Sequence, residues 1–316
     1  DRTSVMSLPV LPIHDPVAHP AAGSDLAPDA VRALEEEIRA LAKQKDAVIL
    51  AHNYQLPEVQ RVADHVGDSL QLAITGKQVP QSTIVFCGVH FMAESACVLA
   101  PGKRVLLPNL SAGCSLADSI TPESLEDWKE RYPGHAVVTY VNSTAEVKAL
   151  SDVCCTSANA ASVVRSLPEK KILFTPDRNL GAWVKAKVPE KEVVVYDGAC
   201  PVHDVLRSSN VEKVKRDRPE AVIIAHPECR ADVLEIADEV CSTTAMLGAV
   251  GRHPSAKTFI VATEHGIVHQ MRNRYPDKEF VIADGCLGCR MHCPYMKMID
   301  LLMVRDALLR ERHVVT

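Results

Sequence analysis

Three cysteines in the last tenth of the sequence have the residue type and the spacing of metal ligands. Cys286, Cys289 and Cys293 lie within DGCLGCRMHCPYM, residues 284–296. The chain has eleven cysteines and no recognisable export signal, which favours a cytoplasmic protein with metal or redox chemistry over a disulfide framework. Together with His292, these three thiols match the Cys₃His ligand set of a structural zinc site. Three thiolates also match the ligands of an iron–sulfur cluster.

Two further cysteines stand in register with this group. Cys114, Cys200 and Cys286 follow one another at a constant interval of 86 residues (200 − 114 and 286 − 200). We therefore expect one cysteine from each of three similar segments at a common centre. A local zinc site leaves Cys114 and Cys200 unexplained, whereas a four-iron cluster on three thiolates keeps one iron open as a Lewis acid. Radical enzymes that use S-adenosylmethionine also keep one iron open, but their cysteines usually follow the reverse order, C-x3-C-x2-C.

Polar residues recur in the same three segments. A hydroxyl lies 17 residues after the first member of a polar cluster at the end of a predicted strand. Hydroxyls at helix starts lie where backbone N–H groups favour anions, and we expect them to act as helix N-caps as well. The three clusters with their hydroxyls are His52-Asn53-Tyr54 with Ser69, Tyr140-Val141-Asn142 with Ser157, and His226-Pro227-Glu228 with Thr243.

Apolar, β-branched runs must position these residues. Runs such as DAVILAHNYQ, HAVVTYVNS and AVIIAHPEC alternate with amphipathic helical stretches, which is typical of βα units and parallel sheets. The sequence predicts an α/β fold of three similar αβα units with parallel sheets around a pseudo-threefold axis, and an active site at the centre. We expect a mobile arm over 1–30, units over 31–135, 136–217 and 218–298, and a C-terminal helix and tail over 299–316. The alternative is a triplicated fold that has no shared site.

Composition narrows the class of protein. The 316 residues are 47% hydrophobic and 24% charged, as in ordinary globular proteins. The net charge of −5 gives no reason to expect nucleic acid or an anionic membrane as a partner. No apolar run approaches the roughly 20 residues that a membrane helix needs.

A series of motifs resembles the quinolinate synthase family from about residue 45 to residue 305. The motifs are LAHNYQLPEVQ, VADHVGDSLQLA, GVHFMAESA, SAGCSLAD, YVNSTAEVKALSDVCCTSANA, TPDRNLG, IAHPEC and HCPYMKM. The resemblance implies an iron–sulfur enzyme of NAD biosynthesis that condenses iminoaspartate with dihydroxyacetone phosphate, losing phosphate and two waters to give quinolinate. It also implies three αβα domains around the cluster, and L-aspartate oxidase or aspartate dehydrogenase as the upstream supplier.

The resemblance implies Cys114, Cys200 and Cys293 as the ligands of a [4Fe-4S] cluster with one open iron. The sequence departs from a common family pattern, C-x2-C-x2-C, by one extra residue before Cys293. Repeat register favours Cys286 as the third ligand, whereas the flanking HCPYM favours Cys293. Cys286 and Cys289 then form a spare pair, which we interpret as a redox switch. The alternative function is a non-catalytic iron–sulfur or zinc redox-sensing protein.

The resemblance also implies roles for the strand-end residues. Tyr54, Tyr140, His203 and Glu228 are the candidates for proton transfer. A tyrosine acts as a base at neutral pH only when its pKa falls well below about 10, and we expect a cationic iron to lower it. Structural supports at strand–helix junctions are expected at Glu94, Asp177 and Asn179. The candidate substrate-binding residues are His52, Ser69, Tyr140, Asn142, Ser157, His226, Glu228 and Thr243.

Overall fold

The computed structural model describes residues 26–283 and 291–315, and its strands form three sheets. The first sheet has the order β13-β4-β3-β1-β2, in which every pairing is parallel except that of β13 with β4. Its strands are β1 (Ala47–His52), β2 (His65–Gly67), β3 (Thr83–Cys87), β4 (Arg104–Leu106) and β13 (Val314–Val315). The helices around it are α1 (Pro28–Gln44), α2 (Pro57–Val62), α3 (Ser69–Gln78), α4 (His90–Leu99) and α14 (Leu301–Arg310).

The other two sheets repeat the parallel part of the first. The second has the order β6-β5-β7-β8 and the third has the order β10-β9-β11-β12. Their strands are β5 (Ala136–Tyr140), β6 (Val153–Cys155), β7 (Lys171–Thr175), β8 (Glu192–Val195), β9 (Val222–Ala225), β10 (Glu239–Val240), β11 (Thr258–Ala262) and β12 (Glu279–Ile282). In each sheet the first strand lies between the second and the third, as expected for βα units with helical crossovers.

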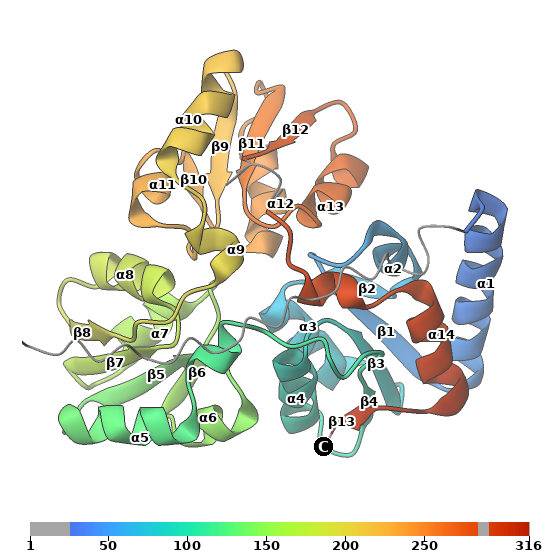
Figure 1. The fold of residues 1–316 in the computed structure, drawn as a ribbon, viewed down its shortest axis with the longest axis horizontal. Helices are drawn as coiled ribbons and strands as arrows, with labels where there is room; N and C mark the ends of the chain where they lie inside the picture. The colour runs from blue at the N-terminus through green and yellow to red at the C-terminus, as the bar shows by residue number, and fades with distance from the viewer. Residues whose placement is uncertain (1–25, 284–290, 316) are drawn as a thin grey trace, which may run out of the picture.

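Helices connect these strands. Figure 1 shows the three groups of elements around a common centre, with α14 beside α1. The helices of the second group are α5 (Pro122–Arg131), α6 (Ala145–Ala149), α7 (Ala160–Ser166) and α8 (Arg178–Lys187). The third group has α10 (Ser208–Asp217), α11 (Ala231–Glu235), α12 (Thr243–Arg252) and α13 (Ile267–Arg274). Short helical turns are η1 (Ala117–Ser119), α9 (Pro201–Asp204) and η2 (Tyr295–Met298). The prediction of an α/β fold with parallel sheets is confirmed.

An aspartate fixes the same turn in each sheet. Asp64 accepts a hydrogen bond from the backbone N–H of Ile49 at 2.8 Å through its side chain, and its own N–H donates back to the Ile49 carbonyl. Asp152 does the same to Val137, and Asp238 to Ile223, each across 15 positions. The aspartate before each short second strand therefore has a structural role. It hydrogen-bonds to both the N–H and the carbonyl of one residue near the start of the first strand.

The apolar core is continuous between the first and third groups. One buried cluster includes Leu50 and Phe86 from the first sheet together with Phe259 and Ile224 from the third. The second group buries its own residues, such as Phe174, in a separate cluster. The first and third groups are therefore held together by hydrophobic packing as well as by polar contacts.

Candidate active site

A central cavity lies beyond the carboxyl ends of the strands. It holds about 870 Å³ of space between its lining atoms, part of it open to solvent. Residues from all three sheet groups line it, which is the expected place for a site on parallel strands. All thirteen residues proposed from the sequence line this cavity: His52, Tyr54, Ser69, Cys114, Tyr140, Asn142, Ser157, Cys200, His203, His226, Glu228, Thr243 and Cys293.

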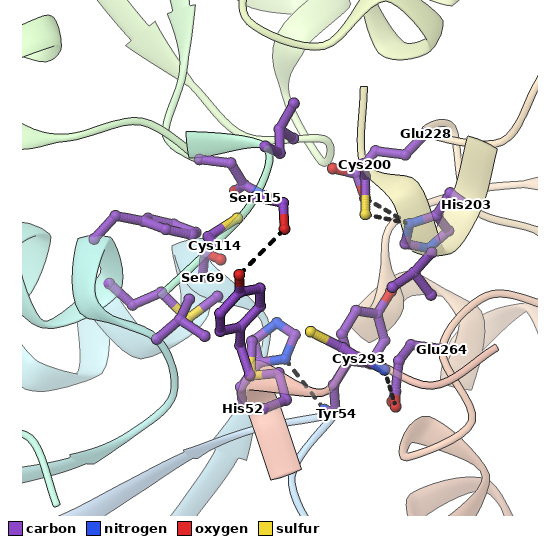
Figure 2. Close-up of a pocket in the computed structure, with 18 of the residues that line it drawn as sticks. His52, Tyr54, Ser69, Cys114, Ser115, Cys200, His203, Glu228, Glu264 and Cys293 are labelled. Carbon is purple, nitrogen blue, oxygen red and sulfur yellow. Dashed lines mark hydrogen bonds and ion pairs between the residues drawn. The ribbon is translucent and has the colours of Figure 1, made fainter. Parts of the chain in front are cut away.

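The three proposed metal ligands face the same space. Figure 2 shows the sulfur atoms of Cys114, Cys200 and Cys293 pointing toward the centre of the cavity. Burial raises the pKa of Cys114 to about 12 and that of Cys293 to about 11, and it raises the pKa of Cys200 well above 9. The thiols also act on one another: the charge of Cys293 raises the pKa of Cys114, and the charges of Cys114 and Cys293 raise the pKa of Cys200. Three buried thiolates become favourable only when a cation compensates them.

Short helical turns direct backbone N–H groups at these sulfur atoms. Cys114 is followed closely by η1, Cys200 caps α9, and Cys293 comes just before η2. Backbone hydrogen bonds from these turns act against burial and lower each thiol's pKa in part. N–H groups aimed at sulfur stabilise the negative charge of metal-bound thiolates. The donor set therefore fits a metal centre held by thiolates.

A second group of possible ligands adjoins Cys200. The ligand atoms of Cys200, His203 and Glu228 lie within 4.8 Å of one another. His203 Nδ1 is 3.1 Å from Glu228 Oε2 and 3.3 Å from Cys200 Sγ. His226 Nδ1 is 3.2 Å from the same carboxylate oxygen. Glu228 Oε1 is buried and has no hydrogen-bond partner among the described residues, so it is free for a metal or a substrate.

The charges in this group follow from burial and from the neighbouring imidazoles. Burial opposes ionisation of Glu228, but His203 and His226 outweigh it and lower its pKa to about 2. Burial lowers the pKa of His203 to about 4. At neutral pH a carboxylate therefore accepts hydrogen bonds from a neutral imidazole.

The two tyrosines remain phenols in the environment that the protein provides. Burial raises the pKa of Tyr54 and of Tyr140 well above 10, and the Glu228 carboxylate raises both further. The protein side chains alone therefore do not produce the lowered pKa expected from the sequence. At neutral pH both side chains are therefore protonated phenols.

The predicted substrate-binding residues surround these groups. Asn142 Oδ1 is buried and unpaired among the described residues, which leaves it available to a ligand. Thr243 Oγ1 accepts a hydrogen bond of 2.9 Å from Asn53 Nδ2, so the third group is tied to the first at the cavity wall. His52 Nδ1 accepts the backbone N–H of Tyr54 at 3.1 Å, and His226 Nδ1 accepts that of Glu228 at 3.3 Å. The same local motif orients both histidines.

The expectation that the three hydroxyls act as N-caps is wrong. Ser69 is the first residue of α3, and the side chain of Asp68 caps that helix by accepting from Gln71 N–H. Ser157 precedes the N-cap of α7, and Thr243 follows the N-cap of α12; neither N-cap residue makes a side-chain cap hydrogen bond. In α3 the cap position falls on Asp68, immediately before Ser69, and aspartate is as good an N-cap as serine. The three hydroxyls line the cavity without a capping role.

The residues expected to be structural supports have that role. Asp177 caps α8 by accepting from Leu180 N–H at 2.7 Å, and its other oxygen accepts from Cys200 N–H at 3.1 Å. Glu94 accepts from Ala145 N–H at 3.0 Å and so links α4 to the start of α6. Asn179 Nδ2 donates to Asp204 at 3.0 Å.

Sequence reasoning missed two charged residues beside Cys293. Glu264 is fully buried, lines the cavity and accepts from Cys293 N–H at 3.2 Å. Lys297 Nζ lies 3.0 Å from the same carboxylate oxygen and donates to the Tyr54 carbonyl. Burial opposes ionisation of Glu264, but Lys297 outweighs it and lowers its pKa to about 2. The available signal was the position of Glu264 after the second strand of its repeat, where the preceding repeat has Asp177.

Some sequence-based alternatives fall on residues that the structure leaves out. Cys286 and Cys289, the alternative ligand and its partner in the spare pair, lie outside the described residues. The local zinc set also depends on them. Within the described part, His292 stacks on His265 with ring centroids 4.8 Å apart. No helix in the described ranges is both long and apolar enough to cross a membrane.

Comparisons with known proteins identify the family of the chain. Residues 36–316 match the family model described as Quinolinate synthetase A protein. The chain is 47% identical over 280 residues to the quinolinate synthase of Thermodesulfovibrio yellowstonii, covering 89% of this chain and 91% of the relative. It is 48% identical over 283 residues to that of Caldicellulosiruptor saccharolyticus, covering 90% and 92%. It is 52% identical over 265 residues to that of Pelobacter propionicus, covering 84% and 86%. The chain belongs to the quinolinate synthetase A family.

Proposed function

We propose that the protein is a quinolinate synthase, which condenses iminoaspartate with dihydroxyacetone phosphate and releases phosphate and two waters. Family membership and relatives about half identical over most of the chain support this function. The relatives' names give no support to the alternative of a redox-sensing protein. The observation that carries the proposal is the convergence of three separate cysteines on one cavity lined by acid–base residues.

We infer that Cys114, Cys200 and Cys293 hold one [4Fe-4S] cluster with an open iron. The support is three buried thiols, each next to a short helical turn that directs N–H groups at sulfur. When bound, the cluster supplies a Lewis acid for a substrate oxygen or nitrogen. Glu228 belongs to the group of possible ligands around Cys200, and its Oε1 atom has no partner among the described residues, so its carboxylate would be a candidate ligand for the open iron.

The protein side chains then bind the substrates and transfer protons. Ser69, Ser157 and Thr243 line the cavity near helix starts, where hydroxyls and N–H groups suit the carboxylates and phosphate of the two substrates. Loss of water requires a proton donor at the departing hydroxyl, and Tyr54 and Tyr140 are protonated phenols. The reaction also requires proton acceptors.

Glu228 and His203 are the acceptors that the site offers, because Glu228 is ionised and His203 is neutral at pH 7. His52 and His226 line the same wall and are proposed to bind substrate carboxylates, with Asn142 as an orienting amide. Each of these roles needs a side chain that faces the cavity, and all of these residues line it.

We also infer that units 31–135, 136–217 and 218–298 are related by an approximate three-fold axis through the cavity. The repeated strand order and the repeated aspartate turn support this arrangement. Residues 1–30 are proposed as a mobile arm, and 299–316 as a C-terminal helix and tail. The protein is proposed to be cytoplasmic, with iminoaspartate supplied by L-aspartate oxidase or aspartate dehydrogenase.

Iron and sulfide analysis of anaerobically purified protein tests the proposal, together with an assay for quinolinate formation. About four irons per chain and quinolinate formation are the expected results. Cys200→Ala should abolish both, whereas Cys87→Ala should retain both because Cys87 is buried within β3 and does not line the cavity. One zinc per chain and no quinolinate from the wild-type protein would exclude this function.

A further inference from the structure

The single helical turn α9 carries a proposed catalytic residue and begins at a proposed metal ligand. It spans only Pro201–Asp204, with Cys200 as its N-cap. Helices shorter than about 12 residues are marginal without tertiary contacts, so the orientation of α9 depends on the side chains around it. Cys200 and His203 line the cavity, whereas Asp204, the next residue, does not. The contacts of Asp204 therefore decide how the far end of this turn is held.

Three consecutive residues of the second group hold α9 at both ends. At its start, Asp177 accepts a hydrogen bond from Cys200 N–H at 3.1 Å. At its end, Asp204 accepts from Arg178 Nη2 at 2.9 Å and from Asn179 Nδ2 at 3.0 Å. The two carboxylate oxygens of Asp204 thus have one donor each. These bonds fix the turn on the second sheet group.

Asp204 also faces the third group. Arg230 Nη1 lies 3.8 Å from Asp204 Oδ1, and Arg230 is only two positions after Glu228. Inside the cavity, His203 Nδ1 lies 3.1 Å from Glu228 Oε2 (Figure 2). The same two segments are thus joined by an inner contact and by an outer ion pair. The outer pair is one residue away on one segment and two residues away on the other, so it limits how far the inner pair can separate.

We propose that Asp204 is a positioning residue that holds His203 at hydrogen-bonding distance from Glu228. Its carboxylate is anchored to the second group and faces Arg230 of the third, so it keeps the two short segments together. This inference rests on the proposed function, because His203 and Glu228 are the proton acceptors assigned there. Asp204 itself acts only through His203 and has no contact with a substrate.

Asp204→Asn keeps the shape of the side chain and removes its charge. A carboxylate accepts at both oxygens, whereas an amide turns its NH₂ group toward one of the two donors, Arg178 or Asn179. We expect the variant to retain its iron, because Asp177 still holds Cys200 N–H. Its kcat should fall about 10- to 100-fold at nearly unchanged KM, since a displacement of about 1 Å can cost about 10²-fold in rate. Asp204→Glu keeps both acceptors and should recover part of that loss.

Asp197→Asn is the matched control. Asp197 pairs with Nη1 of the same arginine, Arg178, at 3.1 Å, but it lies outside α9 and its side chain is 90% exposed, against 20% for Asp204. Such an exposed pair contributes little, so kcat should stay unchanged. Asn179→Ala is a second variant for the case that Asp204→Asn folds poorly. It removes one of the same bonds without adding an unmatched donor, and kcat should fall by a smaller factor.

A His203→Gln background separates positioning from general destabilisation. Asp204→Asn should lower kcat little further in that background, because the group that Asp204 positions is already gone. Equal fold losses in the wild-type and His203→Gln backgrounds would overturn the proposal. Wild-type kcat in Asp204→Asn would also overturn it, as would loss of iron from that variant, since the effect would then act through Cys200.

Crystal structures of the anaerobic holoenzyme, wild-type and Asp204→Asn, test the geometry without any turnover. The expected result is a separation between His203 Nδ1 and Glu228 Oε2 that exceeds the roughly 3.2 Å of an ordinary hydrogen bond in the variant only. An unchanged separation overturns the proposal. A wild-type protein that forms no quinolinate, together with the longer separation in the variant, would remove the proposed function and leave the positioning role of Asp204 standing.

Discussion

Replacing Lys297 with methionine should destabilise the protein and loosen the segment that carries Cys293. Lys297 pairs with Glu264 at 3.0 Å, and the two side chains are only 7% and 1% exposed. Glu264 also accepts from Cys293 N–H, and Lys297 also donates to the Tyr54 carbonyl. One buried ion pair therefore joins the third sheet group, the proposed ligand and the first sheet group.

The magnitude follows from the distance and the burial. Two unit charges 3.0 Å apart attract by about 5.5 kcal/mol at an effective dielectric constant of about 20. Lys297→Met leaves Glu264 as an unpaired buried charge, which typically costs about 3–5 kcal/mol of unfolding free energy. Adding Glu264→Gln removes that charge, so the double variant should lose less than the sum of the two single variants.

Urea unfolding under anaerobic conditions measures this effect, with iron content measured on the same samples. Arg218→Met is the matched control, because Arg218 pairs with Glu279 at 3.3 Å but the two side chains are 36% and 53% exposed. Such a surface pair contributes about 0–1 kcal/mol. Iron content should fall in Lys297→Met and stay at the wild-type level in Arg218→Met. Equal changes in stability for the two variants would refute the reasoning.

Three further predictions concern other parts of the site. Tyr140→Phe should keep its iron but lower kcat about 10²- to 10⁴-fold if the phenol is a general acid, as measured by iron analysis and turnover. Burial lowers the pKa of His52 from 6.5 in the unfolded chain to about 4 in the folded protein. Between these pH values the unfolded chain binds a proton that the folded protein does not, so the free energy of unfolding falls by about 3 kcal/mol as the pH falls from 6.5 to 4. His52→Gln should flatten that part of a series of urea-unfolding measurements against pH. Gly266→Ala places a Cβ atom 2.7 Å from Tyr54 backbone atoms and should cost at least about 1–3 kcal/mol of unfolding free energy, whereas Gly248→Ala, 3.7 Å from an arginine tip, should not destabilise.

Much of the fold could be predicted because its signals are local and repeated. Buried β-branched runs such as Ala47–His52 and Ala136–Tyr140 identify the inner strands, and the 86-residue interval identifies the repeat. The edge strands β2, β6 and β10 have only two or three residues and follow an aspartate, so periodicity alone does not reveal them. The pairing of β13 with β4 joins residues more than 200 positions apart, which no local pattern encodes.

The site was predictable where chemistry repeats at the ends of strands. All proposed site residues lie around one cavity because the carboxyl ends of parallel strands meet there. Sequence reasoning missed Glu264 and Lys297 because their importance comes from partners on other segments of the chain. Lys297 resembles an ordinary surface lysine until the fold places it beside Glu264. The helix-cap error arose because an adjacent residue, Asp68, already fills the cap of α3.

The last helix and strand have a consequence for biogenesis. The helix α14 packs on α1, and β13 completes the edge of the first sheet (Figure 1). Residues 301–315 are translated after the second and third units. The first unit therefore emerges from the ribosome without α14 and β13, and its fold can be completed only when the rest of the chain has been made. Cys293 is also made late, between the third unit's last strand and α14. Assembly of the proposed cluster on all three thiols must therefore follow translation of Cys293, so a nascent chain that stalls before Cys293 is expected to lack it.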